Sequence, residues 1–417
     1  MPRPINTKRL SKIRQVSRQI TEIKVTGTLI SALLAGATTI FIVFWRLSAV
    51  TNNFASSHEV LTKVNLLNDS PWWQSLNFLY GPYYLLLHVT YGGLTHSLFG
   101  LRLASVVCGL IAAGVIFYLS RRYYGYRIAG LSTLAFVCSF GFLALSRTAV
   151  PDAAYLLVPL LLIYALELLA DYLNFSSLLI FFAIAAGSLY FPGAVWLVII
   201  AILIAKANIV HVFKQLTLVS HIVLYAIIGL ILTPIGYFLV SKHSAALLKI
   251  WLGYGLNGQA AALKQLAANF YRTPLDLLAY GSSRQPDYLR LGHLPLLPIY
   301  ISVVILAGLY AVVPRFRHST RFSTLLLLIT ASWLVVSLGV ASIGMLLPLL
   351  IIVFGAGLAY LLKEWYAVFP KNPLAKYFVW SIVSAVVIFG CFFSARSYFV
   401  AWSNDPAVAA GYSTSIR

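Results

Sequence analysis

The chain is organised as a series of apolar runs separated by shorter polar connections. Each run approaches the roughly 20 residues that a helix needs to cross the hydrocarbon core of a bilayer, so we expect about eleven spans. The pattern therefore predicts an all-α, polytopic transmembrane bundle. The runs are 28–45, 101–119, 128–145, 153–170, 176–190, 194–205, 218–239, 296–313, 322–338, 343–362 and 378–394.

Composition supports the same fold class. Hydrophobic residues make up 60% of the chain and charged residues only 10%, with a mean hydropathy of +0.88, whereas ordinary soluble domains carry about 25% charged residues. Cys108, Cys138 and Cys391 all fall inside apolar runs without a CxxC pair, which is typical of small packing residues. No cleavable signal peptide is visible, because the first apolar run is long enough to span.

Two connections are long, at 48–100 and 240–295. Within the first, residues 78–99 are apolar but are interrupted by glycine, proline and histidine. We expect this segment to lie on the membrane surface as a juxtamembrane helix rather than to cross.

Lysine and arginine positions predict the orientation, because cytoplasmic loops carry an excess of both. With residues 1–26 as a basic cytoplasmic tail, the basic clusters fall on one side of a transmembrane domain at 27–395. Both long loops and a short tail at 396–417 are then outside. The clusters are Arg3, Lys8, Arg9, Lys12, Arg14, Arg18 and Lys24; Arg121, Arg122 and Arg127; Lys206 and Lys214; Arg315, Arg317 and Arg321; Lys363, Lys371 and Lys376.

The net charge of +20 is explained by the same clusters. Cationic residues at the cytoplasmic face anchor a protein against anionic lipid. A soluble module with a basic stripe and interleaved aromatics is missing from the sequence, so nucleic acid is not an expected partner.

The first long loop carries the best candidates for acid–base chemistry. His58 and Glu59 are adjacent, and either side chain is a candidate general base. Lys63 follows Glu59 by one helical turn, so the two also fit an exposed ion pair. Asp69 precedes Ser-Pro, where an aspartate commonly starts a turn or caps a helix.

Arginines near other predicted span ends extend this candidate site. Arg147 and Asp152 are close in sequence at the end of the third run. They fit either an outer cleft shared with Glu59, or a snorkelling arginine and a helix-capping aspartate. Arg102, Arg290 and His293 are candidate phosphate contacts, and each also fits a membrane anchor. The sequence leaves a metal site open, and a divalent cation is possible.

Several motifs resemble the membrane glycosyltransferases of the GT-C superfamily, specifically the protein mannosyltransferases and the lipid A aminoarabinose transferase. His58-Glu59 occupies the place of the family's acidic pair in the first loop. The similar segments that follow are YGPYYLLLHV at 80–89, LFGLRLAS at 98–105, RRYYGYR at 121–127 and SRTAVPD at 146–152. The sequence departs from the family where the usual first aspartate of the pair is His58.

The resemblance implies a multi-pass plasma membrane enzyme, prokaryotic by its motifs. It would move a hexosyl or pentosyl group from a polyprenyl-phosphate carrier to an acceptor hydroxyl of a protein, lipid or glycan on the outer face, with inversion. His58, Glu59 and Asp152 would be catalytic. The sugar donor and phosphate would be bound by Lys63, Asp69, Arg102, Arg147, Arg290 and His293.

Two other functions fit the same spans. A lipid or glycan transporter would need access from both sides, and no internal repeat of the kind common in transporters is evident. A non-catalytic protein that retains the fold is the second alternative, favoured by His58. It predicts that Glu59, Arg147 and Asp152 do not share a cleft.

Overall fold

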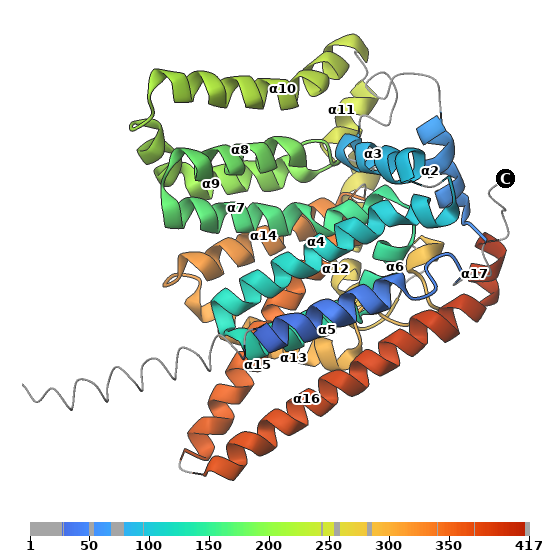
Figure 1. The fold of residues 1–417 in the computed structure, drawn as a ribbon, viewed down its shortest axis with the longest axis vertical. Helices are drawn as coiled ribbons and strands as arrows, with labels where there is room; N and C mark the ends of the chain where they lie inside the picture. Colours follow the sequence, from blue (N-terminus) through green and yellow to red (C-terminus); the bar gives the residue numbers. More distant parts are fainter. Residues whose placement is uncertain are drawn as a thin grey trace, which may run out of the picture.

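The computed structural model describes residues 27, 29–49, 54–67, 79–94, 96–242, 245–253, 259–281, 286–339, 341–370 and 372–412. Every regular element among these residues is a helix, which confirms the predicted all-α class. Most of the long helices run side by side as a bundle, with α10 and α16 at opposite edges (Figure 1).

The apolar runs become the helices of the bundle because a helix satisfies its own backbone hydrogen bonds inside lipid. Helix α15 (Leu347–Val368) is central: with the preceding turn it forms an apolar span of which 83% is buried inside the protein. Its largest interfaces are with α13 (Ile299–Val312), α5 (Tyr126–Val137) and α4 (Leu98–Tyr124). The span in α10 (Leu218–Lys242) is only 11% buried, which places it at the periphery.

Seven described helices are long and apolar enough to cross a membrane, and an eighth span results if one bent pair is counted together. The bent pair is α5 with α6 (Phe140–Arg147), whose axes differ by 62°. Ser139 has extended backbone between them, and its side chain accepts a hydrogen bond from the Phe142 N–H to start α6. Three shorter apolar helices also coincide with predicted runs, at Leu29–Phe44, Phe175–Ser188 and Ile299–Arg315. The total of about eleven spans stays a prediction.

Four further helices complete the body of the bundle. They are α7 (Val158–Tyr172), α8 (Phe175–Ser188), α9 (Ala194–Phe213) and α14 (Thr320–Ser337). Helix α7 packs against α8 and α9, and α14 packs against α9. Together they place the ends of α4, α7 and α14 close to one another.

The first long loop folds into helices. It contains α2 (Ser57–Leu67), α3 (Gly81–Leu87) and a π-helical continuation, η2 (His88–Leu94). The 14 residues of α3 and η2 span about 21 Å, too short for the roughly 30 Å hydrocarbon core. Their position along the membrane surface stays a prediction. Figure 1 shows α2, α3, α6 and α17 gathered toward the same end of the bundle.

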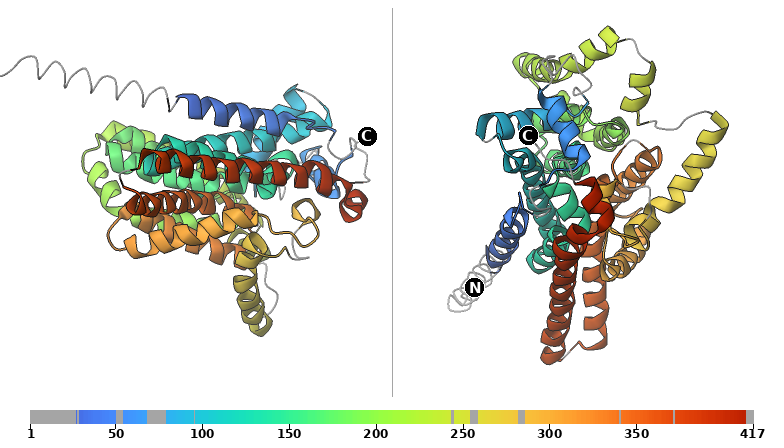
Figure 2. Two further views of the ribbon diagram at one scale, coloured as in Figure 1. Left: turned by 90° about the horizontal axis from the view of Figure 1, so that it is seen from below. Right: turned by 90° about the vertical axis from the view of Figure 1, so that its right-hand side faces the viewer.

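The second long loop contains α11 (Ala245–Trp251), α12 (Gln259–Leu278) and the 3₁₀ turn η4 (Asp287–Leu289). Helix α12 projects from the bundle (Figure 2), and its C-terminal half is anchored to α14. Part of that anchor is the hydrogen bond from the Asn269 side-chain amide to the Ser337 carbonyl, at 2.9 Å. The loop therefore adds a helical wall beside the bundle.

The C-terminal region is packed rather than tail-like. Helix α16 (Pro373–Arg396) continues through η7 (Ser397–Ala401) and η8 (Trp402–Asn404), and α17 (Pro406–Gly411) follows. Trp402 is 1% exposed and Tyr412 is 2% exposed. The expected short tail at 396–417 is therefore folded as far as residue 412.

Candidate active site

Asp152 stands at the junction of two helices at one end of the bundle. The chain leaves α6 in extended backbone at Thr148 and re-enters a helix at Pro151, in the turn η3 (Pro151–Leu156). Proline is favoured at the first position of a helix because it has no N–H to satisfy. This local geometry places the Asp152 carboxylate at the end of the bundle instead of inside a continuous span.

The Asp152 side chain lines a cavity of about 210 Å³. A second carboxylate, Asp276, and two hydroxyl side chains, Thr273 and Ser342, line the same cavity. Thr273 and Asp276 share one face of α12 because they are three residues apart. The remaining lining residues are Pro286, Leu289, Val336, Gly339, Ala341 and Ile343.

Tyr288 links Asp152 to the first long loop. Its hydroxyl donates a 2.7 Å hydrogen bond to Oδ2 of Asp152. On its other side, the Tyr288 ring meets the exposed His58 ring edge-on, with centroids 5.3 Å apart. Burial and the nearby Asp152 charge raise the pKa of Tyr288 well above its usual value, so the phenol stays protonated as a donor at neutral pH. His58 and Asp152, both predicted site residues, therefore meet through a tyrosine.

Glu59 is completely buried and accepts four hydrogen bonds. The Arg102 guanidinium forms two of them, Nε to Oε1 at 2.7 Å and Nη2 to Oε2 at 3.0 Å. The backbone N–H groups of Ala149 and Ser56 supply the others, each at 3.0 Å. Both carboxylate oxygens are thus occupied by protein donors, and Glu59 ties α2 and α4 to the segment that leads to Asp152.

Arg102 and Arg147 also bind the end of the Leu29–Phe44 helix. Arg102 Nη1 donates to the Leu47 carbonyl at 2.7 Å. Arg147, 2% exposed, donates to the carbonyls of Ile42 at 2.8 Å, Val43 at 2.5 Å and Trp45 at 2.6 Å. The last carbonyls of a helix have no intrahelical partner, and cationic side chains commonly bind them. These two guanidinium groups therefore act as a helix cap. Neither Glu59 nor Arg147 lines the cavity of Asp152, so the structure does not bring the three side chains into one cleft. This is the arrangement that the non-catalytic alternative predicts.

The other predicted cationic residues lie in more open positions. The Lys63 ammonium is 6.0 Å from the centroid of the Tyr91 ring. His293 is exposed and stacks on Tyr280, with centroids 5.0 Å apart. Arg290 is half-buried and directly follows Leu289, which lines the cavity. Asp69 lies outside the described residues.

Metal ligands do not gather in the part of the chain that the structure describes, where no three His, Cys, Asp or Glu side chains form a group that could hold an ion. Asp152 and Asp276 are the two carboxylates that line the cavity. A divalent cation therefore stays a prediction.

An apolar groove of about 220 Å³ begins close to Asp152. It is lined by α3, α4, η3 with α7, and α8, including Pro82, Cys108, Ala154 and Ser188. Since Ala154 is two residues after Asp152, the same short turn contributes to both the polar cavity and the apolar groove.

Tyr80 stands at the start of α3 and contacts Phe191, which lines the groove. Its ring meets Tyr155 and Phe191 edge-on, at centroid distances of 6.1 and 6.0 Å. Burial raises its pKa, and the charge of Asp152 adds to the rise. Its backbone is left-handed, with φ of 93°, a conformation that is strained for a non-glycine residue and clusters at functional sites.

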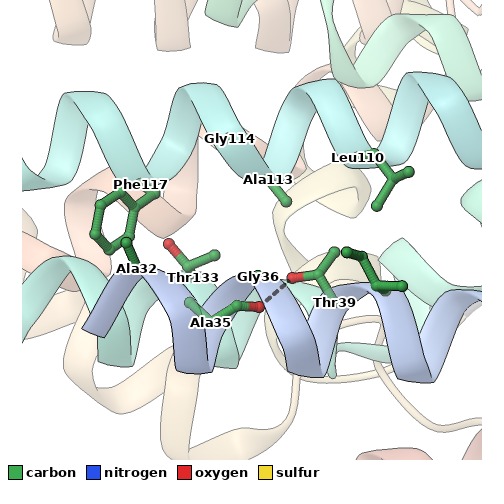
Figure 3. Close-up of a pocket in the computed structure, with 10 residues that line it drawn as sticks. Ala32, Ala35, Gly36, Thr39, Leu110, Ala113, Gly114, Phe117 and Thr133 are labelled. Atoms are coloured by element: carbon green, nitrogen blue, oxygen red, sulfur yellow. Dashed lines mark hydrogen bonds between the residues drawn. The ribbon is translucent and has the colours of Figure 1, made fainter. Parts of the chain in front are cut away.

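A third cavity, of about 340 Å³, lies between the Leu29–Phe44 helix and helices α4 and α5. Figure 3 shows its lining, in which the Thr39 hydroxyl donates to the Ala35 carbonyl of its own helix, at 2.6 Å. The other lining side chains are almost all apolar, including Leu110, Ala113 and Phe117. It offers no charged group for chemistry.

Tyr288, Asp276, Thr273 and Ser342 were not among the residues predicted from the sequence. One feature of the sequence could have pointed to Asp276: the chain contains only ten carboxylates, so each of them is a candidate for the site. The other three are ordinary residue types in apolar or loop segments, and only the packing of distant elements brings them to Asp152.

Comparison with known proteins agrees with this architecture. Residues 84–238 match the family described as dolichyl-phosphate-mannose-protein mannosyltransferase. The chain is similar to the crystal structure of ArnT from Cupriavidus metallidurans bound to undecaprenyl phosphate, with 14% identity and a TM-score of 0.56 over 91% of this chain and 76% of that one. The same protein in the apo state gives 11% identity and a TM-score of 0.52 over 93% and 77%. Comparison with curated proteins finds no match.

These similarities confirm the predicted resemblance to GT-C membrane glycosyltransferases. Because the sequence identity is only 14% and 11%, the likeness to the solved structures establishes the fold alone, which is that of a multi-pass membrane protein.

Proposed function

We propose that this protein is a membrane glycosyltransferase that moves a sugar from a polyprenyl-phosphate carrier to an acceptor hydroxyl. The observation that carries the proposal is the pair of sites on either side of η3. A cavity with two carboxylates and two hydroxyls suits a sugar, and an adjoining apolar groove suits an isoprenoid chain. ArnT, which shares the fold, was solved with undecaprenyl phosphate.

Asp152 is the proposed general base. Its carboxylate lines the cavity, whereas the Glu59 carboxylate is buried and holds four protein donors. Asp152 would take the proton of the acceptor hydroxyl, whose oxygen then attacks the anomeric carbon. The bond from that carbon to the phosphate oxygen breaks, and the phosphate monoester leaves with the electron pair. Attack from the face opposite the phosphate inverts the anomeric centre.

The leaving phosphate needs positive charge where its own charge develops. Lys63, Arg290, His293 and the exposed His58 are the proposed sources. Arg102 and Arg147 are better assigned to the helix cap, because protein oxygens already accept their hydrogen bonds. The basic clusters predicted to be cytoplasmic, among them Arg121, Arg122 and Arg127, lie at the end of α4 away from Asp152. Because cytoplasmic loops carry an excess of lysine and arginine, these clusters support an active site on the outer face and a cytoplasmic N-terminus.

The test uses membranes that contain the wild type, Asp152→Asn or the matched control Asp171→Asn, each given labelled polyprenyl-phosphate sugars. We expect Asp152→Asn to lower transfer by about 10²-fold or more, as for loss of a general base. Asp171→Asn should keep wild-type transfer, because Asp171 is at the other end of α7. Undiminished transfer by Asp152→Asn would exclude this base, and a wild type inactive with every sugar tried would refute the function.

A further inference from the structure

The C-terminal strap, which we define as residues 398–412, contains three buried aromatic residues that contact one another, Tyr398, Trp402 and Tyr412. The rings of Tyr398 and Trp402 are stacked, with centroids 4.9 Å apart and an interplanar angle of 13°. Tyr412 meets Trp402 edge-on at 5.3 Å. The strap begins in the π-helical turn η7, and such turns inside α-helices occur frequently at functional sites.

The strap is attached to the helix that leads to Asp152. Phe140, at the start of α6, contacts both Tyr398 and Trp402, with centroid distances of 6.1 and 6.5 Å. At the other end of α6, the Arg147 guanidinium lies 5.6 Å from the Tyr398 ring and 4.8 Å from the Phe399 ring. Cation–π contacts of this length are favourable, more so when they are shielded from water.

The far end of the strap reaches the element that carries Tyr288. Helix α17 packs against η4, and Val408 within α17 is 2% exposed. Burial raises the pKa of Tyr412, and the charge of Glu59 adds to the rise. The strap thus lies beside η4, which carries Tyr288, and beside Arg147 at the end of α6.

We propose that the strap positions Tyr288 so that its hydroxyl holds the Asp152 carboxylate in place. Trp402 and Tyr412 are then positioning residues, which act on the reaction through the elements that the strap packs against, α6 and η4. The inference rests on the proposed function for its catalytic consequence, but its structural part, the anchoring of η4, is independent of any reaction.

The first measurement separates turnover from donor binding. Trp402→Ala and Tyr412→Ala should lower kcat by about tenfold or more while KM for the labelled polyprenyl-phosphate sugar stays unchanged, because small displacements of catalytic groups reduce rate strongly. Tyr412→Phe keeps the ring and should restore wild-type turnover. Phe392→Ala, a matched control on the same C-terminal helix with a 68% exposed side chain, should behave as the wild type. Unchanged kcat with raised KM would overturn the proposal.

The second measurement needs no activity. Hydrogen–deuterium exchange would follow the η4 amides, among them the Leu289 N–H that donates to the Pro286 carbonyl at 2.8 Å. We expect faster exchange there in Trp402→Ala, in Tyr412→Ala and in the milder Val408→Ala, and no change in Phe392→Ala. Unaltered exchange in the three strap variants would refute the anchoring. If the wild type transfers no sugar, exchange at η4 still decides whether the strap holds Tyr288.

Discussion

Helix α4 carries an arginine that forms an ion pair at each of its ends, and the two ion pairs differ in their exposure to water. Arg102 and Arg122 are separated by about 30 Å along the helix. Arg102 is 2% exposed, and its ion pair with Glu59 is fully enclosed. Arg122 binds two acids on α7, Glu167 at 2.8 Å and Asp171, which has a 35% exposed side chain.

The Arg122 end forms a shared network. Glu167 also accepts a hydrogen bond from the Tyr123 hydroxyl at 2.9 Å and pairs with Arg321 of α14 at 3.5 Å. Loss of one member leaves other partners, and water screens the remaining charge. At the Arg102 end, Glu59 pairs with Arg102 in an enclosed site, so loss of either leaves a buried charge without its counterion.

The protein is held more rigidly at the Arg102 end of α4 than at the Arg122 end. The enclosed pair fixes the first long loop and the segment leading to Asp152, and the open network joins α4, α7 and α14 at the far end. The proposed chemistry occurs at the enclosed end, where catalytic groups need fixed positions.

The largest effect is expected for Glu59→Gln. Removal of its charge leaves Arg102 buried without a counterion, which should cost about 3–5 kcal/mol of stability. Glu167→Gln is the matched control and should cost less, since Arg122 keeps Asp171. Thermal unfolding of the detergent-solubilised protein measures both. Equal losses would remove the distinction between the two ends, and a Glu59→Gln/Arg102→Met variant should recover part of the stability.

Arg147→Met should destabilise the protein by about 2–3 kcal/mol, because three carbonyls lose a charged donor. Arg127→Met is the control, since Arg127 is exposed and contacts the Trp380 ring. Unfolding and transfer are measured on the same preparations. An Arg147→Met protein with normal stability but a raised KM for the donor would instead assign Arg147 to phosphate binding.

Tyr288→Phe removes the hydroxyl that donates to Asp152 and should lower transfer by about tenfold, the equivalent of one hydrogen bond to a charged group. Tyr280→Phe, on the exposed ring that stacks with His293, is the matched control. Initial rates with the labelled donor measure both. Normal transfer by Tyr288→Phe would mean that the hydrogen bond from Tyr288 to Asp152 does not contribute to the reaction.

The smallest effect is expected for Asp171→Asn, at less than about 1 kcal/mol, because partly exposed ion pairs contribute little. Raising the ionic strength should bring the wild type and this variant still closer, since salt screens exposed charges. Unfolding at low and high salt measures the difference. A loss as large as that of Glu59→Gln would mean that this network is not screened.

Much of the fold could be predicted from the sequence because the signal is local. Each of the eleven apolar runs coincides with a helix or, at 128–145, with a bent pair. The glycine, proline and histidine interruptions of 78–99 set that segment apart from the predicted spans in the sequence, and its position along the membrane surface stays a prediction. The number of crossings stays open because three of these helices are short, and composition does not decide whether they cross.

The partners of the charged residues were decided by tertiary structure. Sequence spacing favoured Lys63, four residues away, as the partner of Glu59, whereas the folded chain supplies Arg102, 43 residues away. Asp152 accepts a hydrogen bond from Tyr288, which is 136 residues away in the sequence. The strap contacts η4 from the C-terminal region of the chain. Hydrophobic runs alone determine helices, since lipid requires each segment to satisfy its own backbone. Which side chains then meet depends on how helices far apart in the sequence pack together, and spacing within one segment does not contain that information.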